Sequence, residues 1–145
     1  MKPTVVLRIA AILILANAIG HTIGLVTRKN TSNKEMQEVI HQMESHSFTI
    51  GGSFRTMDEA YTGNSAIVSV TLFILAALLW VLGSAAPKSP APFLPILLLL
   101  AIAFAANTVI SIRYFFVVPT LLQAGAALLV AVAIFQLRSQ ARSQS

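Results

Sequence analysis

Four long apolar runs constrain this chain more than any other feature. They cover roughly residues 4–26, 61–83, 93–113 and 118–137. Each run is near the ~20 residues that a helix needs to cross ~30 Å of hydrocarbon. Only helices and closed barrels satisfy all backbone polar groups in lipid, and these runs are continuous rather than alternating. The sequence therefore predicts an all-α fold, a four-helix transmembrane bundle forming one domain over residues 1–137, followed by a polar, frayed tail at 138–145.

Composition agrees with a lipid environment. Only 10% of the 145 residues are charged and 56% are hydrophobic, whereas soluble domains carry about 25% charged residues. The absence of cysteine excludes disulfides, thiolate metal sites and cysteine nucleophiles. The net charge of +5 comes from basic residues scattered at the ends of the apolar runs. We interpret them as interface and orientation charges, so the expected partner is membrane lipid and not nucleic acid.

The one long connection, residues 27–60, contains a short helical pattern. Its apolar residues recur at i, i+3, i+4 and i+7; they are Met36, Val39, Ile40 and Met43. This pattern predicts an amphipathic helix at about 33–45 that lies at the membrane interface. Ser32, with Glu35 three residues later, predicts a capping box at its start. His41 and His46 are five residues apart with no further ligand nearby, so no metal site is predicted.

The N-terminus and the orientation each leave two alternatives. A basic start, an apolar segment and an A-x-A sequence at 16–18 are typical of a cleaved signal peptide. Against cleavage, Arg8 interrupts the apolar segment, and the run continues through Leu25. Lysine and arginine are equally frequent on the two sides of the predicted bundle. If Arg55 and Arg113 are buried in the bundle, the balance favours both termini in the cytoplasm.

Polar residues inside the apolar runs gather at one end of the predicted bundle. Arg8 is the exception. Because ionisable groups at membrane depth are costly and need partners, we expect Arg55 and Arg113 to pair with Asp58 and Glu59 around a polar pocket. The residues expected to line this pocket are His21, Arg55, Asp58, Tyr61, Asn107, Arg113 and Tyr114.

Each of these residues also has a structural interpretation. His21 is then a hydrogen-bonding contact between helices, and Asp58 with Arg55 is a pair that fixes helix register. Arg113 is then an interface anchor next to an aromatic belt that includes Phe115 and Phe116.

Three segments carry a resemblance. They are GHTIG at 20–24, FRTMDEAYTGNS at 54–65 and NTVISIRYFFVVP at 107–119. In them the chain is similar to an uncharacterised family of small bacterial integral membrane proteins with four transmembrane helices. The resemblance covers nearly the whole chain. It implies the four-helix fold, a bacterial inner membrane location and a site among these motifs, but no substrate.

Two functional hypotheses of different classes follow. The first is a membrane protein that binds an anionic or amphiphilic small molecule or lipid in the polar pocket, since guanidinium groups bind carboxylate and phosphate bidentately. The second is a small membrane enzyme in which His21 and Asp58 form an acid–base pair acting on a lipophilic substrate. An accessory role in a homo-oligomer or larger membrane complex is a further alternative. No motif for a cofactor or nucleophile favours a reaction class.

Overall fold

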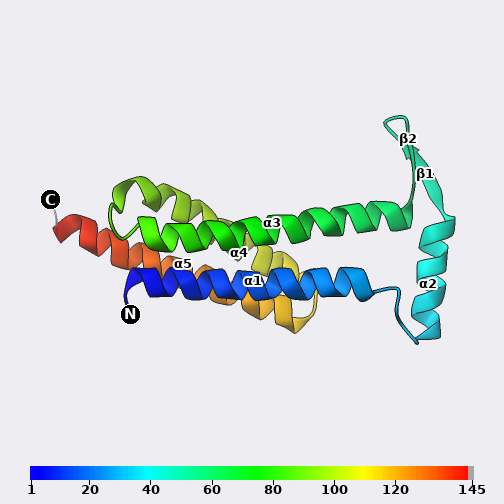
Figure 1. Cartoon of the computed structure of the whole chain (residues 1–145), viewed down its shortest axis with the longest axis horizontal. Helices are drawn as coiled ribbons and strands as arrows, with labels where there is room; N and C mark the ends of the chain where they lie inside the picture. The colour runs from blue at the N-terminus through cyan, green and yellow to red at the C-terminus, as the bar shows by residue number, and fades with distance from the viewer. Residues whose placement is uncertain (144–145) are drawn as a thin grey trace. The chain divides into compact units, whose positions relative to one another are not determined.

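The computed structural model describes residues 1–143 and is mostly helical (Figure 1). Four of its helices are long and apolar enough to cross a membrane, which confirms the predicted set and makes the chain an integral membrane protein. They are α1 (Pro3–Thr27), α3 (Met57–Ala85), α4 (Leu94–Tyr114) and α5 (Val117–Ser143). The 3-10 helix η1 (Ala91–Phe93) directly precedes α4.

Two of these helices extend beyond their predicted bounds. α3 starts at Met57 rather than near residue 61, because Thr56 and Glu59 form a capping box. The Thr56 N–H donates to Glu59 Oε2 at 2.9 Å, and the Glu59 N–H donates to Thr56 Oγ1 at 3.1 Å. α5 stays helical through Ser143, so the frayed tail expected from residue 138 is wrong for the residues described there. Residues 144–145 lie outside the described residues.

The long connection contains α2 (Lys34–Ser45), close to the predicted segment 33–45. Its cap differs from the expected one. Asn33, not Ser32, lies at the N-cap, where its side chain accepts hydrogen bonds from the N–H groups of Glu35 at 2.9 Å and Met36 at 3.2 Å. A short amide side chain directly before the first helical residue reaches these N–H groups, so the predicted Ser32–Glu35 box does not form.

A β-hairpin follows α2, so the all-α prediction was incomplete. Strands β1 (Ser47–Ile50) and β2 (Ser53–Thr56) pair antiparallel, with Ser47 opposite Thr56 and Ile50 opposite Ser53. The two-residue turn between them has φ of 57° at Gly51 and 78° at Gly52. Positive φ at both turn positions matches the twist of paired strands and favours glycine.

The chain divides into two compact units, which are described separately. Among the described residues, the first unit comprises 1–17 and 72–143, and the second unit comprises 18–71. In the first unit α4 and α5 pack together, and its buried core includes Leu7, Leu79, Leu97 and Phe104. Its helices approach closely at Gly125, where a Cβ atom would lie 3.0 Å from Leu13 Cδ1.

Candidate functional site

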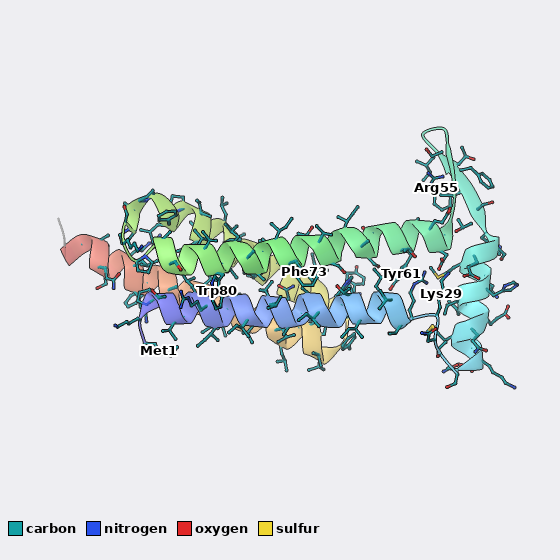
Figure 2. The ribbon with its side chains drawn as sticks, in the orientation of Figure 1. Met1, Lys29, Arg55, Tyr61, Phe73 and Trp80 are labelled. Carbon is teal, nitrogen blue, oxygen red and sulfur yellow. The ribbon has the colours of Figure 1, made fainter. Side chains whose placement is uncertain are left out.

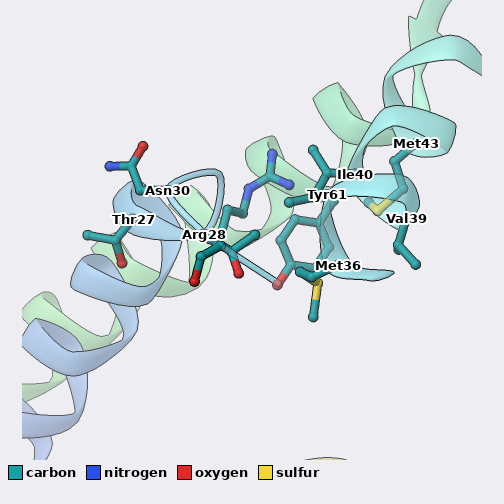
Figure 3. A pocket seen from close by; sticks show the side chains of 10 residues that line it. Thr27, Arg28, Asn30, Met36, Val39, Ile40, Met43 and Tyr61 are labelled. Carbon is teal, nitrogen blue, oxygen red and sulfur yellow. The ribbon is translucent and has the colours of Figure 1, made fainter. Parts of the chain in front are cut away.

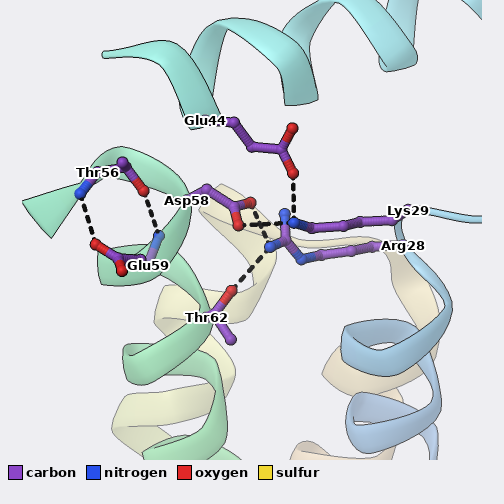
Figure 4. A network of polar contacts seen from close by, with 7 residues as sticks. All are labelled: Arg28, Lys29, Glu44, Thr56, Asp58, Glu59 and Thr62. Carbon is purple, nitrogen blue, oxygen red and sulfur yellow. Dashed lines mark hydrogen bonds and ion pairs between the residues drawn. The ribbon is translucent and has the colours of Figure 1, made fainter. Parts of the chain in front are cut away.

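The second unit contains a network of charged side chains where α1 ends and α3 begins (Figure 4). Arg28 directly follows α1, and the first turns of α3 carry Asp58 and Thr62. Arg28 Nη2 forms an ion pair with Asp58 Oδ1 and donates to Thr62 Oγ1 at 2.8 Å. The Arg28 and Asp58 side chains are only 15% and 11% exposed. One carboxylate thus links the two helices at a largely buried position.

Lys29 extends this network to α2. Its Nζ lies 2.9 Å from Asp58 Oδ2 and 2.5 Å from Glu44 Oε1. Glu44, and then Asp58, raise the pKa of Lys29 above its ordinary value by accepting hydrogen bonds from the ammonium group. Asp58 therefore pairs with two adjacent cations, and Lys29 connects α2 to the end of α1 and the start of α3.

An open pocket of about 610 Å³ lies in the same unit (Figure 3). Arg28 and Tyr61 belong to its wall, with the Arg28 Cζ atom 5.0 Å from the centre of the Tyr61 ring. The remaining lining residues come from the last residue of α1, from the segment between α1 and α2, and from one face of α2: Thr27, Asn30, Thr31, Ser32, Met36, Val39, Ile40 and Met43. The pocket wall is therefore polar on one side and apolar on the other.

The four predicted site residues in the second unit do not form one cluster. Tyr61 lines the pocket and Asp58 belongs to the network behind it. Arg55 is exposed on β2 and donates to the Phe54 carbonyl at 2.7 Å (Figure 2). The expected pairing of Arg55 with Asp58 is wrong, because the hairpin carries Arg55 before α3 begins and Arg28 takes its place. Glu59 is held instead by the Thr56 cap.

His21 lies at a different level of the second unit from Asp58. Its Nδ1 lies within hydrogen-bond distance of Ser69 Oγ, at 3.0 Å. Ser69 follows Asp58 by eleven residues on α3, which corresponds to about 16 Å along the helix axis. The structure does not bring His21 and Asp58 together as an acid–base pair, and the contact of His21 is the interhelical one that its structural interpretation predicted.

The other three candidates belong to the first unit. Asn107, Arg113 and Tyr114 lie on α4 and are all exposed. None of them makes a hydrogen bond or ion pair within the described part of the first unit, which contains no acidic residue. Within the second unit, the acids expected to pair with Arg113 have other partners: Asp58 pairs with Arg28 and Lys29, and Glu59 with the Thr56 cap. The buried polar contact at this end of α4 is between Ser111 Oγ and Thr120 Oγ1 at 2.8 Å, across the turn into α5.

Sequence reasoning missed Arg28 and Lys29 as site residues. A signal was available, because these two cations directly follow the first apolar run. All acidic residues of the chain lie between residues 35 and 59, namely Glu35, Glu38, Glu44, Asp58 and Glu59. Cations that directly follow a membrane span are the nearest partners for an acid that begins the next one. Charge distribution along the chain therefore pointed to Arg28 and Lys29 rather than to Arg113.

Among the described residues, no three His, Cys, Asp or Glu side chains gather closely enough to hold a metal ion. Comparisons of the chain with protein families, with curated proteins and with solved structures found no match.

Proposed function

We propose that this protein binds an amphiphilic molecule, a lipid or a compound of similar chemistry, in the pocket of the second unit. The observation that carries the proposal is the divided pocket wall. The α2 side supplies Met36, Val39, Ile40 and Met43, whereas residues 27–32 supply hydroxyl, amide and guanidinium groups. An apolar tail and a polar head on the same ligand match these two sides.

The head group is proposed to accept hydrogen bonds from Arg28. Only Nη2 of this guanidinium is engaged by Asp58 and Thr62 within the described chain, and a guanidinium has five N–H donors. A carboxylate or phosphate oxygen is the acceptor that such a group binds best. Because Asp58 holds Arg28 in place, the remaining donors are already oriented before the ligand arrives.

The pocket is proposed to lie at one membrane surface, with α2 as an interfacial helix. It lies where α1 ends and α3 begins, which are the ends of two spans. The proposal places the chain in a bacterial inner membrane with both termini in the cytoplasm. The condition that would favour this orientation is not met, because Arg55 and Arg113 are both exposed and lysine and arginine are equally frequent on the two sides.

The absence of cysteine allows a direct test of the orientation. Single cysteines at Ser53, in the hairpin, and at Ser89, between α3 and η1, are labelled in intact cells with a membrane-impermeant maleimide. The proposal predicts labelling of Ser53→Cys and protection of Ser89→Cys until the membrane is opened. The reverse pattern would exclude a cytoplasmic location of the termini.

Ligand retention tests the proposed function. The protein is extracted gently, examined by native mass spectrometry, and any bound molecule is identified after organic extraction. Val39→Trp places a large side chain in the pocket wall, and His41→Trp makes a similar addition on α2 at an exposed position outside the lining. We expect wild type and His41→Trp to retain the same amphiphile and Val39→Trp to lose it. Equal retention in all three proteins, or none in wild type, would contradict the proposal.

A further inference from the structure

The first unit contains a cation within the α1 span, and no carboxylate contacts it among the described residues of that unit. Arg8 lies five residues after the start of α1, which is about 8 Å along the helix axis. The acidic residues of the chain all belong to the second unit. Arginine inside a span is costly to insert and is normally paired. Within the described part of the first unit its charge therefore has no counter-anion.

The contacts of Arg8 leave most of its donors unused. Nη2 donates to Ser84 Oγ at 3.3 Å, and Cζ lies 4.9 Å from the centre of the Trp80 ring. Nε is buried and has no hydrogen-bond partner among the described residues. A cation over a tryptophan face is partly stabilised but stays positively charged. The side chain is thus held in position by Trp80 and Ser84 without being neutralised.

An apolar groove of about 470 Å³ begins next to this guanidinium. On α1 it is lined by Ala11, Ile12 and Leu15, and on α3 by Phe73, Ala76, Ala77, Trp80 and Val81. Small alanine side chains leave the hollow between the larger ones. Arg8, Ile12 and Leu15 are spaced i, i+4 and i+7, so Arg8 heads the groove on one helical stripe. Figure 2 labels Phe73 and Trp80 along the α3 side.

We propose that this groove binds an anionic phospholipid, with one acyl chain along the apolar wall and the phosphate paired with Arg8. Guanidinium binds phosphate in a bidentate manner, and the pairing supplies the missing counter-charge. The first unit has no acidic residue, and its basic residues are Lys2, Arg8, Lys88, Arg113, Arg138 and Arg142. Such a unit attracts anionic lipid electrostatically. This site is separate from the pocket of the second unit and shares no residue with it.

Trp80 makes the site directly observable, since it is the chain's single tryptophan. The full-length protein is reconstituted in vesicles of phosphatidylcholine and phosphatidylglycerol, with the acyl chains of one lipid brominated to quench tryptophan fluorescence. A tryptophan that faces lipid but adjoins no specific lipid-binding site is quenched in proportion to the mole fraction of the brominated lipid. We expect brominated phosphatidylglycerol to quench Trp80 as if enriched about fivefold over phosphatidylcholine.

Three variants decide the result. Arg8→Gln is expected to abolish the preference for phosphatidylglycerol, whereas Lys2→Gln, with the same loss of charge at an exposed position, is expected to keep it. Ala77→Phe fills the groove while leaving Arg8 intact, so it is expected to abolish the preference even if Arg8→Gln fails to fold. Equal quenching by both lipids in wild type would overturn the proposal. So would an equal loss in Lys2→Gln, or a co-purified protein that supplies a carboxylate to Arg8 in place of lipid.

Discussion

Asp58 forms ion pairs with two cations, Arg28 and Lys29, so replacing it with asparagine has a defined expected effect. The Asp58→Asn substitution keeps the size of the side chain and an acceptor for Arg28 but removes the charge that two adjacent cations share. Exposed ion pairs contribute about 0–1 kcal/mol, and breaking a buried one costs about 3–5 kcal/mol. The Arg28 and Asp58 side chains are 15% and 11% exposed, and Lys29 is 47% exposed. We therefore expect a loss of about 2 kcal/mol, between these limits.

Hydrogen exchange measured by mass spectrometry reads this loss locally. The backbone amides of α2 and of the first turns of α3 are expected to exchange roughly 30-fold faster in Asp58→Asn, the factor for about 2 kcal/mol. Amides of α4 and α5, in the first unit, are expected to stay unchanged. Glu44→Gln is the control, because it removes only the Lys29–Glu44 pair, whose side chains are 47% and 45% exposed.

The control variant is expected to change exchange much less than Asp58→Asn, because exposed ion pairs contribute little to stability. Equal effects of Asp58→Asn and Glu44→Gln would refute the argument that burial sets the magnitude. Acceleration spread evenly over α4 and α5 would refute the assignment of the network to the second unit. A double-mutant cycle of Arg28→Gln with Asp58→Asn then isolates the pair, with an expected coupling of about 1–2 kcal/mol.

Three further predictions concern local features. Asn33→Ala is expected to destabilise α2 by about 1 kcal/mol and Ser32→Ala to leave it unchanged, as measured by amide exchange in α2. Because Glu44 and Asp58 raise the pKa of Lys29 above 10.5, the contribution of its charge to stability is fully present below pH 10.5. This contribution is lost as the pH rises through the folded-state pKa of Lys29. Unfolding curves measured at alkaline pH are expected to show this loss of stability in wild type and not in Lys29→Arg, because arginine stays protonated there. Gly125→Leu is expected to lower thermal stability by about 1–3 kcal/mol, whereas Gly63→Ala, where a Cβ meets nothing within 4 Å, should not destabilise the protein.

The membrane helices were predictable because a single physical requirement determines them. Continuous apolar runs of spanning length allow only a helix in lipid, and all four runs are helical. The hairpin was also predictable, since Gly51 and Gly52 separate two short segments rich in β-branched and aromatic residues. The hairpin was not predicted because residues 27–60 were interpreted only as a connection between two spans that contains one short helix.

The partner of Asp58 was not predictable from helical spacing. Arg55 lies three residues before Asp58, which would place both on one face if α3 began there. The hairpin ends at Thr56, however, and it carries Arg55 away from that face. Arg28 lies far before Asp58 in the sequence, and the two meet because the chain turns back through α2 and the hairpin. Periodicity within one helix carries no information about such a path. The charge distribution along the chain indicated Arg28 and Lys29 as partners, but the pocket beside the network required the structure.

The most direct test of ligand binding in the second unit is photo-crosslinking from the pocket wall. A genetically encoded benzophenone side chain is placed at Met36, which lines the pocket, and in a matched variant at His41, which is exposed on α2 outside the lining. Membranes are irradiated, and the adducts are identified by mass spectrometry. The account predicts one dominant amphiphile attached at position 36 and only a mixture of bulk lipids at position 41. The same mixture at both positions, or no adduct at position 36, would contradict it.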